Sequence, residues 1–268
     1  MSFRDAKILK FVPNALTIGN SLCGFIAILY TLRAYENGDN SAKLLVFVVS
    51  AWMIFAAMIF DALDGLAARA FHAASMTGIQ MDSLADMVTF GVAPATLVAI
   101  LTHSLRGELN PMQMLVVYAL CSVYLGCAAL RLAIYNVKAI TEHKSSKSFS
   151  GLPSPGGAAA ICVIIFFVYK LSTRETSGID LHRLMFILPA YAALLGLLMV
   201  SNIPYLHVGK WLVTMGRSRR KLLLFIVLMV LVAIFQIYAL AAIITGYILS
   251  GPLSLLLPKK TRQRIFED

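Results

Sequence analysis

The sequence predicts an all-α polytopic membrane protein, and three observations lead to this prediction. Of the 268 residues, 59% are hydrophobic and only 13% are charged, compared with roughly 25% charged in a typical soluble domain. The mean hydropathy is +0.81. Apolar runs of about 20 residues, the length that spans a bilayer as a helix, recur along the chain. No segment has the composition of a separate soluble domain.

Six apolar runs predict the membrane-spanning helices of a core. They are residues 13–33, 43–60, 83–104, 112–136, 155–171 and 183–201. The first run follows basic residues, but it is long, polar near its start and without a small-residue cleavage site, so we expect a retained span rather than a signal peptide. A short interfacial segment is expected before it, with Phe3, Ile8, Leu9 and Phe11 facing the lipid.

A further hydrophobic region, Leu222–Leu257, is too long for one ordinary span. It predicts a C-terminal hydrophobic extension that is either one long helix or two short helices. The basic tail beyond it would return to the side of the N-terminus after two crossings, which favours eight crossings in total. We therefore expect a six-helix membrane core with its interfacial segment over residues 1–201. Residues 202–268 would form a cytoplasmic basic loop, the extension and the basic tail.

Lys and Arg residues divide unevenly between the two sides of the predicted helices. With a cytoplasmic N-terminus, the basic residues on that side are Arg4, Lys7, Lys10, Arg69, Lys138, Lys144, Lys147, Lys210, Arg217, Arg219, Arg220 and Lys221. The opposite loops hold only Arg33, Lys43, Arg106, Lys170, Arg174 and Arg183. The positive-inside rule then predicts a protein of the cytoplasmic (inner) membrane whose N-terminus faces the cytoplasm. The net charge of +10 is too dispersed to indicate nucleic-acid binding.

Four aspartates stand inside or beside the second and third predicted spans. Asp61 and Asp64 are three positions apart, and Asp82 and Asp86 are four apart. Residues at these spacings share one face of a helix. Because a carboxylate in the middle of a membrane helix costs about 2.5–3.5 kcal/mol, four together require a compensating cation. Two helices can hold all four around one small volume.

Carboxylate oxygens are ligands for hard divalent cations, and Mg²⁺ binds through a few of them while leaving positions for phosphate oxygens. The charge of four carboxylates balances two divalent ions. Pairs of metal ions recur in enzymes that catalyse displacement at phosphorus. The sequence therefore predicts a site for two Mg²⁺ or Mn²⁺ ions at the cytoplasmic ends of the second and third helices.

Small and basic residues accompany the aspartates. Gly65, Ala68 and Gly78 leave room for a ligand close to the helices, and Arg69 offers several donors to phosphate oxygens. On the first helix, Asn14, Thr17 and Asn20 share one face. They are either a wall for phosphate or cytidine or a set of helix–helix hydrogen-bonding groups.

A second group of polar residues lies near the cytoplasmic ends of the fourth and fifth predicted helices. Arg131 is either a bidentate partner for a carboxylate or phosphate or a side chain that extends to the membrane interface, and Asn136 follows it. The loop 138–155 ends in a segment rich in Gly and Pro, and we expect it to cover a pocket, with Ser154 as a contact.

The pattern Asp-x2-Asp-Gly-x2-Ala-Arg-x8-Gly-x3-Asp-x3-Asp resembles the signature of the CDP-alcohol phosphotransferases, which are membrane enzymes with a six-helix core. Other segments are similar to the phosphatidylserine synthase branch of that family. They are PNALTIGNSLCGF (13–25), FDALDG (60–65), MDSLADMVTFGVAPA (81–95), ALRLAIYN (129–136), FSGLPSPGGAA (149–159) and LMVS (198–201). The resemblance extends from the first predicted span to the sixth.

The resemblance implies transfer of a phosphatidyl group from CDP-diacylglycerol to L-serine, with release of CMP. It also implies that Asp61, Asp64, Asp82 and Asp86 bind two metal ions and that Asp86 is the general base. Gly65, Ala68, Arg69 and Gly78 would then line the nucleotide and pyrophosphate site. The resemblance further implies a homodimer.

Two alternatives remain open at this point. The enzyme class can be the same with another acceptor, such as glycerol phosphate or inositol phosphate, or with an ether-lipid donor for archaetidylserine synthesis. The chain can instead be a cation transporter that binds its substrate at the aspartates. Transporters usually distribute polar residues through the membrane depth, whereas these acids cluster at one edge. Few basic residues besides Arg69 and Arg131 are available for an anionic acceptor, which favours serine.

Overall fold

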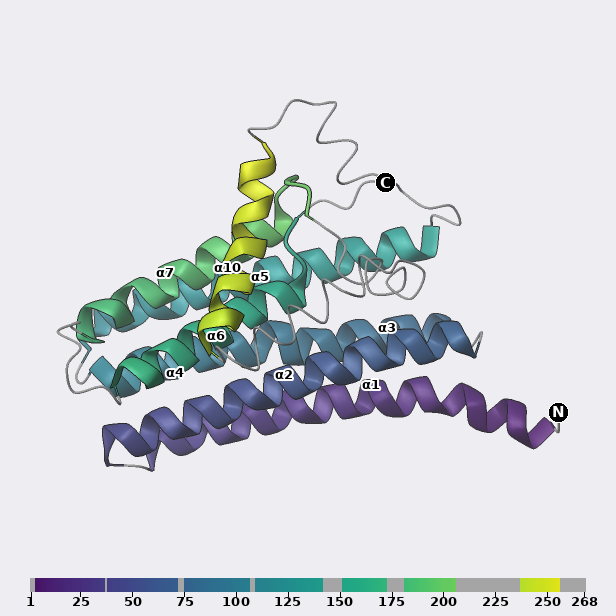
Figure 1. Cartoon of the computed structure of the whole chain (residues 1–268), viewed down its shortest axis with the longest axis horizontal. Coiled ribbons are helices and arrows are strands. Elements are labelled where there is room, and N and C mark those ends of the chain that lie inside the picture. Colours follow the sequence, from purple (N-terminus) through teal and green to yellow (C-terminus); the bar gives the residue numbers. More distant parts are fainter. Residues whose placement is uncertain are drawn as a thin grey trace.

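The computed structural model describes residues 3–36, 38–71, 75–106, 109–141, 151–172, 181–205 and 237–255. These residues form a bundle of long helices without a β-strand among them (Figure 1). The elements are α1 (Phe3–Leu32), η1 (Arg33–Tyr35), α2 (Asn40–Ala70), α3 (Met76–Asp86), η2 (Met87–Val92), α4 (Ala93–Arg106), α5 (Pro111–Thr141), α6 (Ser154–Ser172), α7 (Leu181–Val200) and α10 (Ile237–Ser254).

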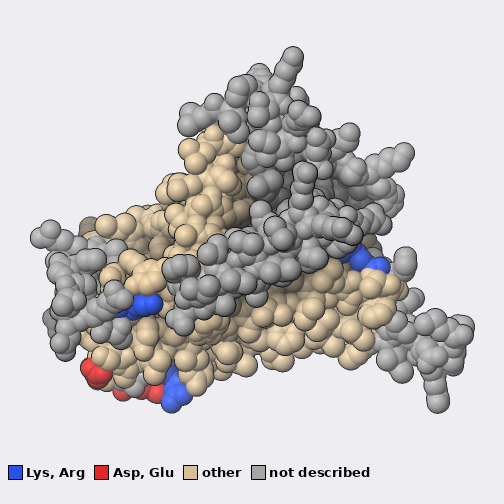
Figure 2. All heavy atoms as spheres, viewed as in Figure 1, with Lys and Arg blue, Asp and Glu red and all other residues tan. Residues whose placement is uncertain are grey.

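The predicted fold class is confirmed, because the described residues include six helices long and apolar enough to cross a membrane. They are Phe11–Tyr35, Asn40–Ala70, Met76–Leu105, Pro111–Val137, Ser154–Ser172 and Ile237–Ser254. A shorter apolar helix, Phe186–Val200, occupies the sixth predicted run. On the face in Figure 2, the described surface is almost free of charge between the two ends of the bundle. The chain is therefore an integral membrane protein.

The helices that carry the aspartates are longer than predicted. The second run was expected to end at residue 60, but α2 continues to Ala70, and the third crossing begins at Met76 rather than at residue 83. Ser75 caps α3, because its Oγ accepts a hydrogen bond from the backbone N of Gly78 at 3.0 Å. The aspartates consequently lie within helices, where the backbone fixes the direction of each side chain.

The expected interfacial segment at the N-terminus is not separate from the first span. Helix α1 is continuous from Phe3 to Leu32 and includes Pro13. Proline removes one hydrogen bond from a helix, but its φ angle is compatible with helical geometry. Thr17 Oγ1 donates a hydrogen bond to the backbone carbonyl of Pro13 at 3.0 Å. A proline was therefore not sufficient to end the helix.

Helices α1 and α2 pack along their length, and α1 also contacts α3, α4 and η2 (Figure 1). Helix α5 packs against α7, and α6 lies against α2. The largest fully buried side chains include Phe47, Phe90, Leu97, Tyr124 and Phe166. This packing places the second half of α2, the whole of α3 and the first half of α1 side by side, which is where the aspartates lie.

The third crossing contains a π-helical segment, η2, that begins directly after Asp86 and joins α3 to α4. Its widened turn is held by two buried hydroxyls. Tyr124 donates a hydrogen bond from its hydroxyl to the carbonyl of Phe90 at 2.8 Å, and Thr89 donates one to the carbonyl of Asn20 at 3.1 Å. Gly24 on α1 leaves room for Thr89, because a Cβ there would collide with it. Such segments are frequent at functional sites.

The C-terminal part of the chain is described only in part. Helix α10 packs against α6 and crosses it at a steep angle (Figure 1). Residues 206–236 and 256–268, which include most of the predicted basic loop, the first part of the extension and the basic tail, lie outside the described residues. The number of crossings in the extension and the proposed division at residue 201 stay predictions.

Candidate active site

The carboxylates of α2 and α3 converge on one small volume. Asp61, Asp64 and Asp82 each offer an oxygen atom, and these atoms all lie within 4.8 Å of one another. Asp64 is buried, whereas Asp61 and Asp82 are partly exposed. Asp86 does not belong to this group of three, but it lies within electrostatic range of all its members. The helical spacing thus brings together three of the four predicted aspartates, from two helices.

Helix α1 orients two of the aspartates. Thr17 Oγ1 donates a hydrogen bond to Asp64 Oδ2 at 2.9 Å, and Asn20 Nδ2 donates one to Asp86 Oδ1 at 3.0 Å. In each pair the hydrogen bond holds one carboxylate oxygen in place. The shared face of α1 that the sequence predicted therefore makes helix–helix hydrogen bonds to the aspartates themselves.

The aspartates have no cationic partner within the described part of the chain, where none of the four forms an ion pair with Lys, Arg or His. Asp82 Oδ1 is buried without a hydrogen-bond partner, and so is Asn20 Oδ1. A buried carboxylate oxygen without a partner is costly. The three carboxylates converge, and one of them, Asp82, has a buried oxygen without a hydrogen-bond partner. Such a set of oxygen ligands suits a hard divalent cation. The residues of this cluster therefore fit a metal ion.

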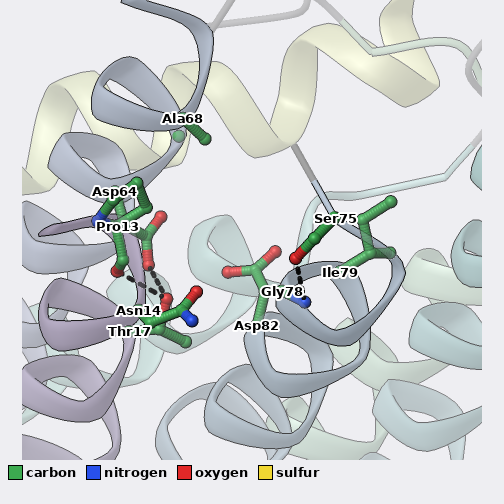
Figure 3. Close-up of a pocket in the computed structure, with 10 residues that line it drawn as sticks. Pro13, Asn14, Thr17, Asp64, Ala68, Ser75, Gly78, Ile79 and Asp82 are labelled. Atoms are coloured by element: carbon green, nitrogen blue, oxygen red, sulfur yellow. Dashed lines mark hydrogen bonds between the residues drawn. The ribbon is translucent and has the colours of Figure 1, made fainter. Parts of the chain in front are cut away.

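A pocket of about 120 Å³ lies beside the carboxylates, between α1, α2 and α3 (Figure 3). In this view Asp64 and Asp82 face one another from opposite walls, and α1 closes the pocket with Asn14 and Thr17. The lining residues are Pro13, Asn14, Thr17, Asp64, Gly65, Ala68, Ser75, Gly78, Ile79 and Asp82. Five residues predicted from the sequence to contact the CDP-lipid are among them: Asn14, Thr17, Gly65, Ala68 and Gly78.

The two glycines keep the pocket open in different ways. A Cβ at Gly78 would lie 3.0 Å from Ser75 Oγ and 3.6 Å from Asn14 Oδ1, so a side chain there would narrow the pocket. A Cβ at Gly65 would meet only Arg69 Nη2, at 3.9 Å. Gly65 therefore presents bare helix surface to the pocket.

Arg69 and Asn20 do not line this pocket. Arg69 is exposed, and its Nε donates a hydrogen bond to the carbonyl of Gly65 at 2.9 Å. This bond folds the guanidinium back over α2 next to the pocket wall. Asn20 lies one turn further along α1 than Thr17, against Asp86.

The residues predicted on the acceptor side lie on α5 and α6. Asn136 Oδ1 accepts a hydrogen bond from Ser83 Oγ at 2.9 Å, which ties α5 to the residue next to Asp82. Arg131 Nη1 donates to the carbonyl of Met199 at 3.1 Å, at the end of α7. Ser154 begins α6 and is 2% exposed, and its Oγ has no hydrogen-bond partner in the described residues.

Some residues of the site were missed in the sequence. Ser75, Ile79 and Pro13 line the pocket, and a serine three positions before Gly78 is a helix-capping pattern that gives a usable signal for the first of them. Tyr135 on α5 lies within electrostatic range of Asp61, Asp82 and Asp86 and also of Arg131. No sequence pattern indicates a role for Tyr135.

Comparison with known proteins identifies the family. The sequence profile described as CDP-alcohol phosphatidyltransferase matches residues 10–201, which contain all four aspartates. The chain belongs to this family. Members of the CDP-alcohol phosphatidyltransferase family generally depend on divalent metal ions, which agrees with the acidic cluster. The matched residues end at the C-terminus of α7, so helix α10 lies outside them.

This CDP-alcohol phosphatidyltransferase is similar to curated proteins named CDP-diacylglycerol–serine O-phosphatidyltransferase and to one named archaetidylserine synthase. A CDP-diacylglycerol–serine O-phosphatidyltransferase of Helicobacter pylori is 30% identical over 75% of the chain and 74% of the relative. The Bacillus subtilis protein of the same name is 34% identical over 75% of the chain and 93% of the relative. An archaetidylserine synthase of Methanothermobacter thermautotrophicus is 30% identical over 76% of the chain and 74% of the relative.

Proposed function

We propose that this protein is a phosphatidylserine synthase that transfers the phosphatidyl group of CDP-diacylglycerol to L-serine and releases CMP. The observation that carries the proposal is the convergence of Asp61, Asp64 and Asp82 beside a pocket lined by Gly65, Ala68 and Gly78. The names of the relatives support serine as the acceptor. We place the protein in the inner membrane with the site facing the cytoplasm, and we propose a homodimer.

Asp61, Asp64 and Asp82 would hold the first of two divalent cations, Mg²⁺ or Mn²⁺, and Asp86 would take part in holding the second. When bound, the metal would offset the charge of the pyrophosphate and of the departing CMP. Thr17 fixes one oxygen of Asp64 and leaves the other for a ligand. Hydrogen bonds of this kind orient metal-binding carboxylates.

The pocket beside the carboxylates would receive the pyrophosphate and part of the nucleotide of the donor. Gly65, Ala68 and Gly78 present little side chain, so phosphate oxygens can approach the helices closely. Asn14 lines the pocket from α1 and offers an amide to the ligand. Arg69 lies at the edge, where its guanidinium can donate to phosphate.

The reaction is a displacement at the phosphorus of the phosphatidyl group. The serine hydroxyl oxygen forms a bond to that phosphorus, and the bond from phosphorus to the bridging oxygen of CMP breaks. A hydroxyl is a weak nucleophile at neutral pH, and Asp86 accepts its proton during the attack. Because Asn20 holds Asp86 Oδ1, the second oxygen of Asp86 is left for the substrate. We prefer direct transfer over an enzyme intermediate, since the two described serines beside the aspartates have other partners. Ser75 caps α3, and Ser83 donates its hydroxyl hydrogen to Asn136.

Serine would bind on the side of the site formed by Arg131, Asn136 and Ser154. Arg131 supplies a positive charge for the serine carboxylate. Among the described residues, Arg69 and Arg131 are the basic side chains near the site, and an acceptor that carries a phosphate would require more cations than this. A small zwitterion suits the charge of the site better.

A second candidate differs only in the donor lipid. The relative named archaetidylserine synthase matches this chain over a similar length and with similar identity to the phosphatidylserine synthases. An ether-linked CDP-lipid presents the same pyrophosphate and cytidine to the pocket. The chemistry at the aspartates would be the same for both donors.

The test is CMP release by the purified protein in detergent. CDP-diacylglycerol and Mg²⁺ or Mn²⁺ are combined with L-serine, glycerol phosphate or inositol phosphate in separate reactions, and a parallel series uses an ether-linked CDP-lipid. We expect release that requires both the metal and serine. Release with a different alcohol and not with serine would contradict the proposal, and so would serine-dependent release that persists unchanged in EDTA.

A further inference from the structure

The proposed general base stands at the start of the π-helical segment η2. Met87 is the first residue of η2, and Asp86 precedes it with a helical backbone (φ −61°, ψ −36°). Thr89 follows Asp86 by three positions, a spacing that places both residues on one side of the third crossing. The backbone between them is helical throughout, so contacts that hold η2 also affect the direction of the Asp86 side chain.

Asn20 on α1 contacts both residues. Its side-chain Nδ2 donates a hydrogen bond to Asp86 Oδ1 at 3.0 Å, and its backbone carbonyl accepts one from Thr89 Oγ1 at 3.1 Å. Asn20 and Thr89 are fully buried, so water does not compete for the bond between them. Asp86 and Thr89 are thus joined to the same residue of α1, one through its side chain and the other through its backbone.

Gly24 allows Thr89 to reach the backbone of α1. A Cβ at Gly24 would lie 2.9 Å from the Cα of Thr89 and would collide with its hydroxyl, so the two elements are in direct contact there. Within an α-helix, the carbonyl of Asn20 also accepts the bond from the backbone N of residue 24, and a carbonyl oxygen can accept two hydrogen bonds. The bond from Thr89 is therefore additional to those of the helix, and α1 does not depend on it.

The opposite side of η2 is held by α5. The hydroxyl of Tyr124 donates a hydrogen bond to the carbonyl of Phe90 at 2.8 Å. A Cβ at Gly91 would lie 3.4 Å from Leu125 Cδ1, so the segment also lies close against α5 at that position. Because these contacts are independent of α1, loss of the Thr89 hydroxyl should leave η2 folded and should change only its attachment to α1.

We propose that Thr89 is a positioning residue for the general base. Its hydroxyl holds Asn20 level with Asp86, and the Asn20 amide then holds the Asp86 carboxylate in the direction from which it takes the proton of the acceptor. This inference rests on the proposed function, because it takes Asp86 as the proton acceptor. Neither Thr89 nor Asn20 lines the pocket beside the carboxylates, so the effect should fall on turnover and not on substrate binding.

The test compares Thr89→Val, which keeps the shape but lacks the hydroxyl, with Thr89→Ser, which keeps the hydroxyl, in the full chain. We expect kcat to fall by about threefold to tenfold in Thr89→Val, the range that one hydrogen bond typically contributes, and to stay near the wild-type value in Thr89→Ser. Both KM values and the affinity for Mn²⁺ should not change. Thr102→Val is the matched control, since Thr102 is equally buried in the same crossing and donates to the carbonyl of Val98 at 2.8 Å. It should turn over normally, with a change in melting temperature at least as large as that of Thr89→Val.

A double-mutant cycle with Asp86→Asn shows whether Thr89 acts through the base. If it does, Thr89→Val should leave the residual turnover of Asp86→Asn unchanged. Multiplicative effects, an unchanged kcat in Thr89→Val, or equal losses of kcat in Thr89→Val and Thr89→Ser would each overturn the proposal. A wild-type protein that uses another alcohol in place of serine would instead contradict the proposed function, and the same variants measured with that alcohol would still decide the role of Thr89.

Discussion

Asp86→Asn should lower the turnover of serine by about 10²–10⁴-fold, the contribution typical of a general base. The amide that replaces the carboxylate has nearly the same shape, and its oxygen can still accept the hydrogen bond from Asn20. It cannot take a proton from the serine hydroxyl. Because Asp86 lies outside the group of three converging carboxylates, the affinity of that group for its Mn²⁺ ion should fall by far less than the turnover.

The measurement is serine-dependent CMP release at saturating metal and donor, with Mn²⁺ binding followed in the same preparation. Asp39→Asn is the matched control, because Asp39 caps the opposite end of α2, where its side chain accepts a hydrogen bond from the backbone N of Ala42 at 3.2 Å. That variant should turn over normally. Near-normal turnover by Asp86→Asn would exclude Asp86 as the base.

Asp61→Asn should have a different effect, namely a loss of metal affinity. The described residues make no hydrogen bond to the Asp61 carboxylate, and one of its oxygens lies within 4.8 Å of ligand atoms of Asp64 and Asp82. Loss of a group that only supports a metal ligand typically costs 10–100-fold in affinity, so loss of a ligand should cost about 100-fold or more. Activity should be lost at low metal concentration and should recover in part at high concentration.

Titration of Mn²⁺ by electron paramagnetic resonance, with free Mn²⁺ as the signal, measures this affinity directly. The wild type, Asp61→Asn and Asp86→Asn form the series. We expect the affinity to fall strongly in the first variant and little in the second. Equal affinities in all three proteins, or a larger loss in Asp86→Asn, would contradict the assignment of Asp61 as a ligand.

The sequence was sufficient to predict the helices and the acidic cluster, because both follow from short-range rules. The helical period places Asp61 and Asp64 on one face of a helix, and it does the same for Asp82 and Asp86. Because carboxylates are costly within a membrane, we expected the two pairs to meet around a cation. The ends of α2 and α3 were misjudged because the predicted spans were limited to apolar residues. A helix can continue past a charged residue when groups on neighbouring helices and a bound ligand compensate the charge.

Other features depend on contacts between residues far apart in the chain. The π-helical segment after Asp86 is held by Tyr124 and by the bond from Thr89 to the carbonyl of Asn20, and no local pattern indicates either contact. The same is true of Arg131, whose partner is the carbonyl of Met199. These contacts could be identified only when the helices were placed side by side.

Helix α1 emerges as part of the catalytic machinery in our proposal, although it carries no acid in the site. Thr17 and Asn20 each hold one oxygen of an aspartate on another helix. In the proposed mechanism, the second oxygen of Asp64 is a metal ligand and that of Asp86 accepts the proton of the substrate.

The central claim is that the carboxylates of α2 and α3 hold the catalytic metal. The most direct measurement is the anomalous scattering of Mn²⁺ in crystals of the protein with bound CDP. We predict density within metal–oxygen bonding distance of oxygens of Asp61, Asp64 and Asp82, with the pyrophosphate of CDP beside it. Density elsewhere in the protein, or none at these residues in a preparation that is active with Mn²⁺, would contradict the claim.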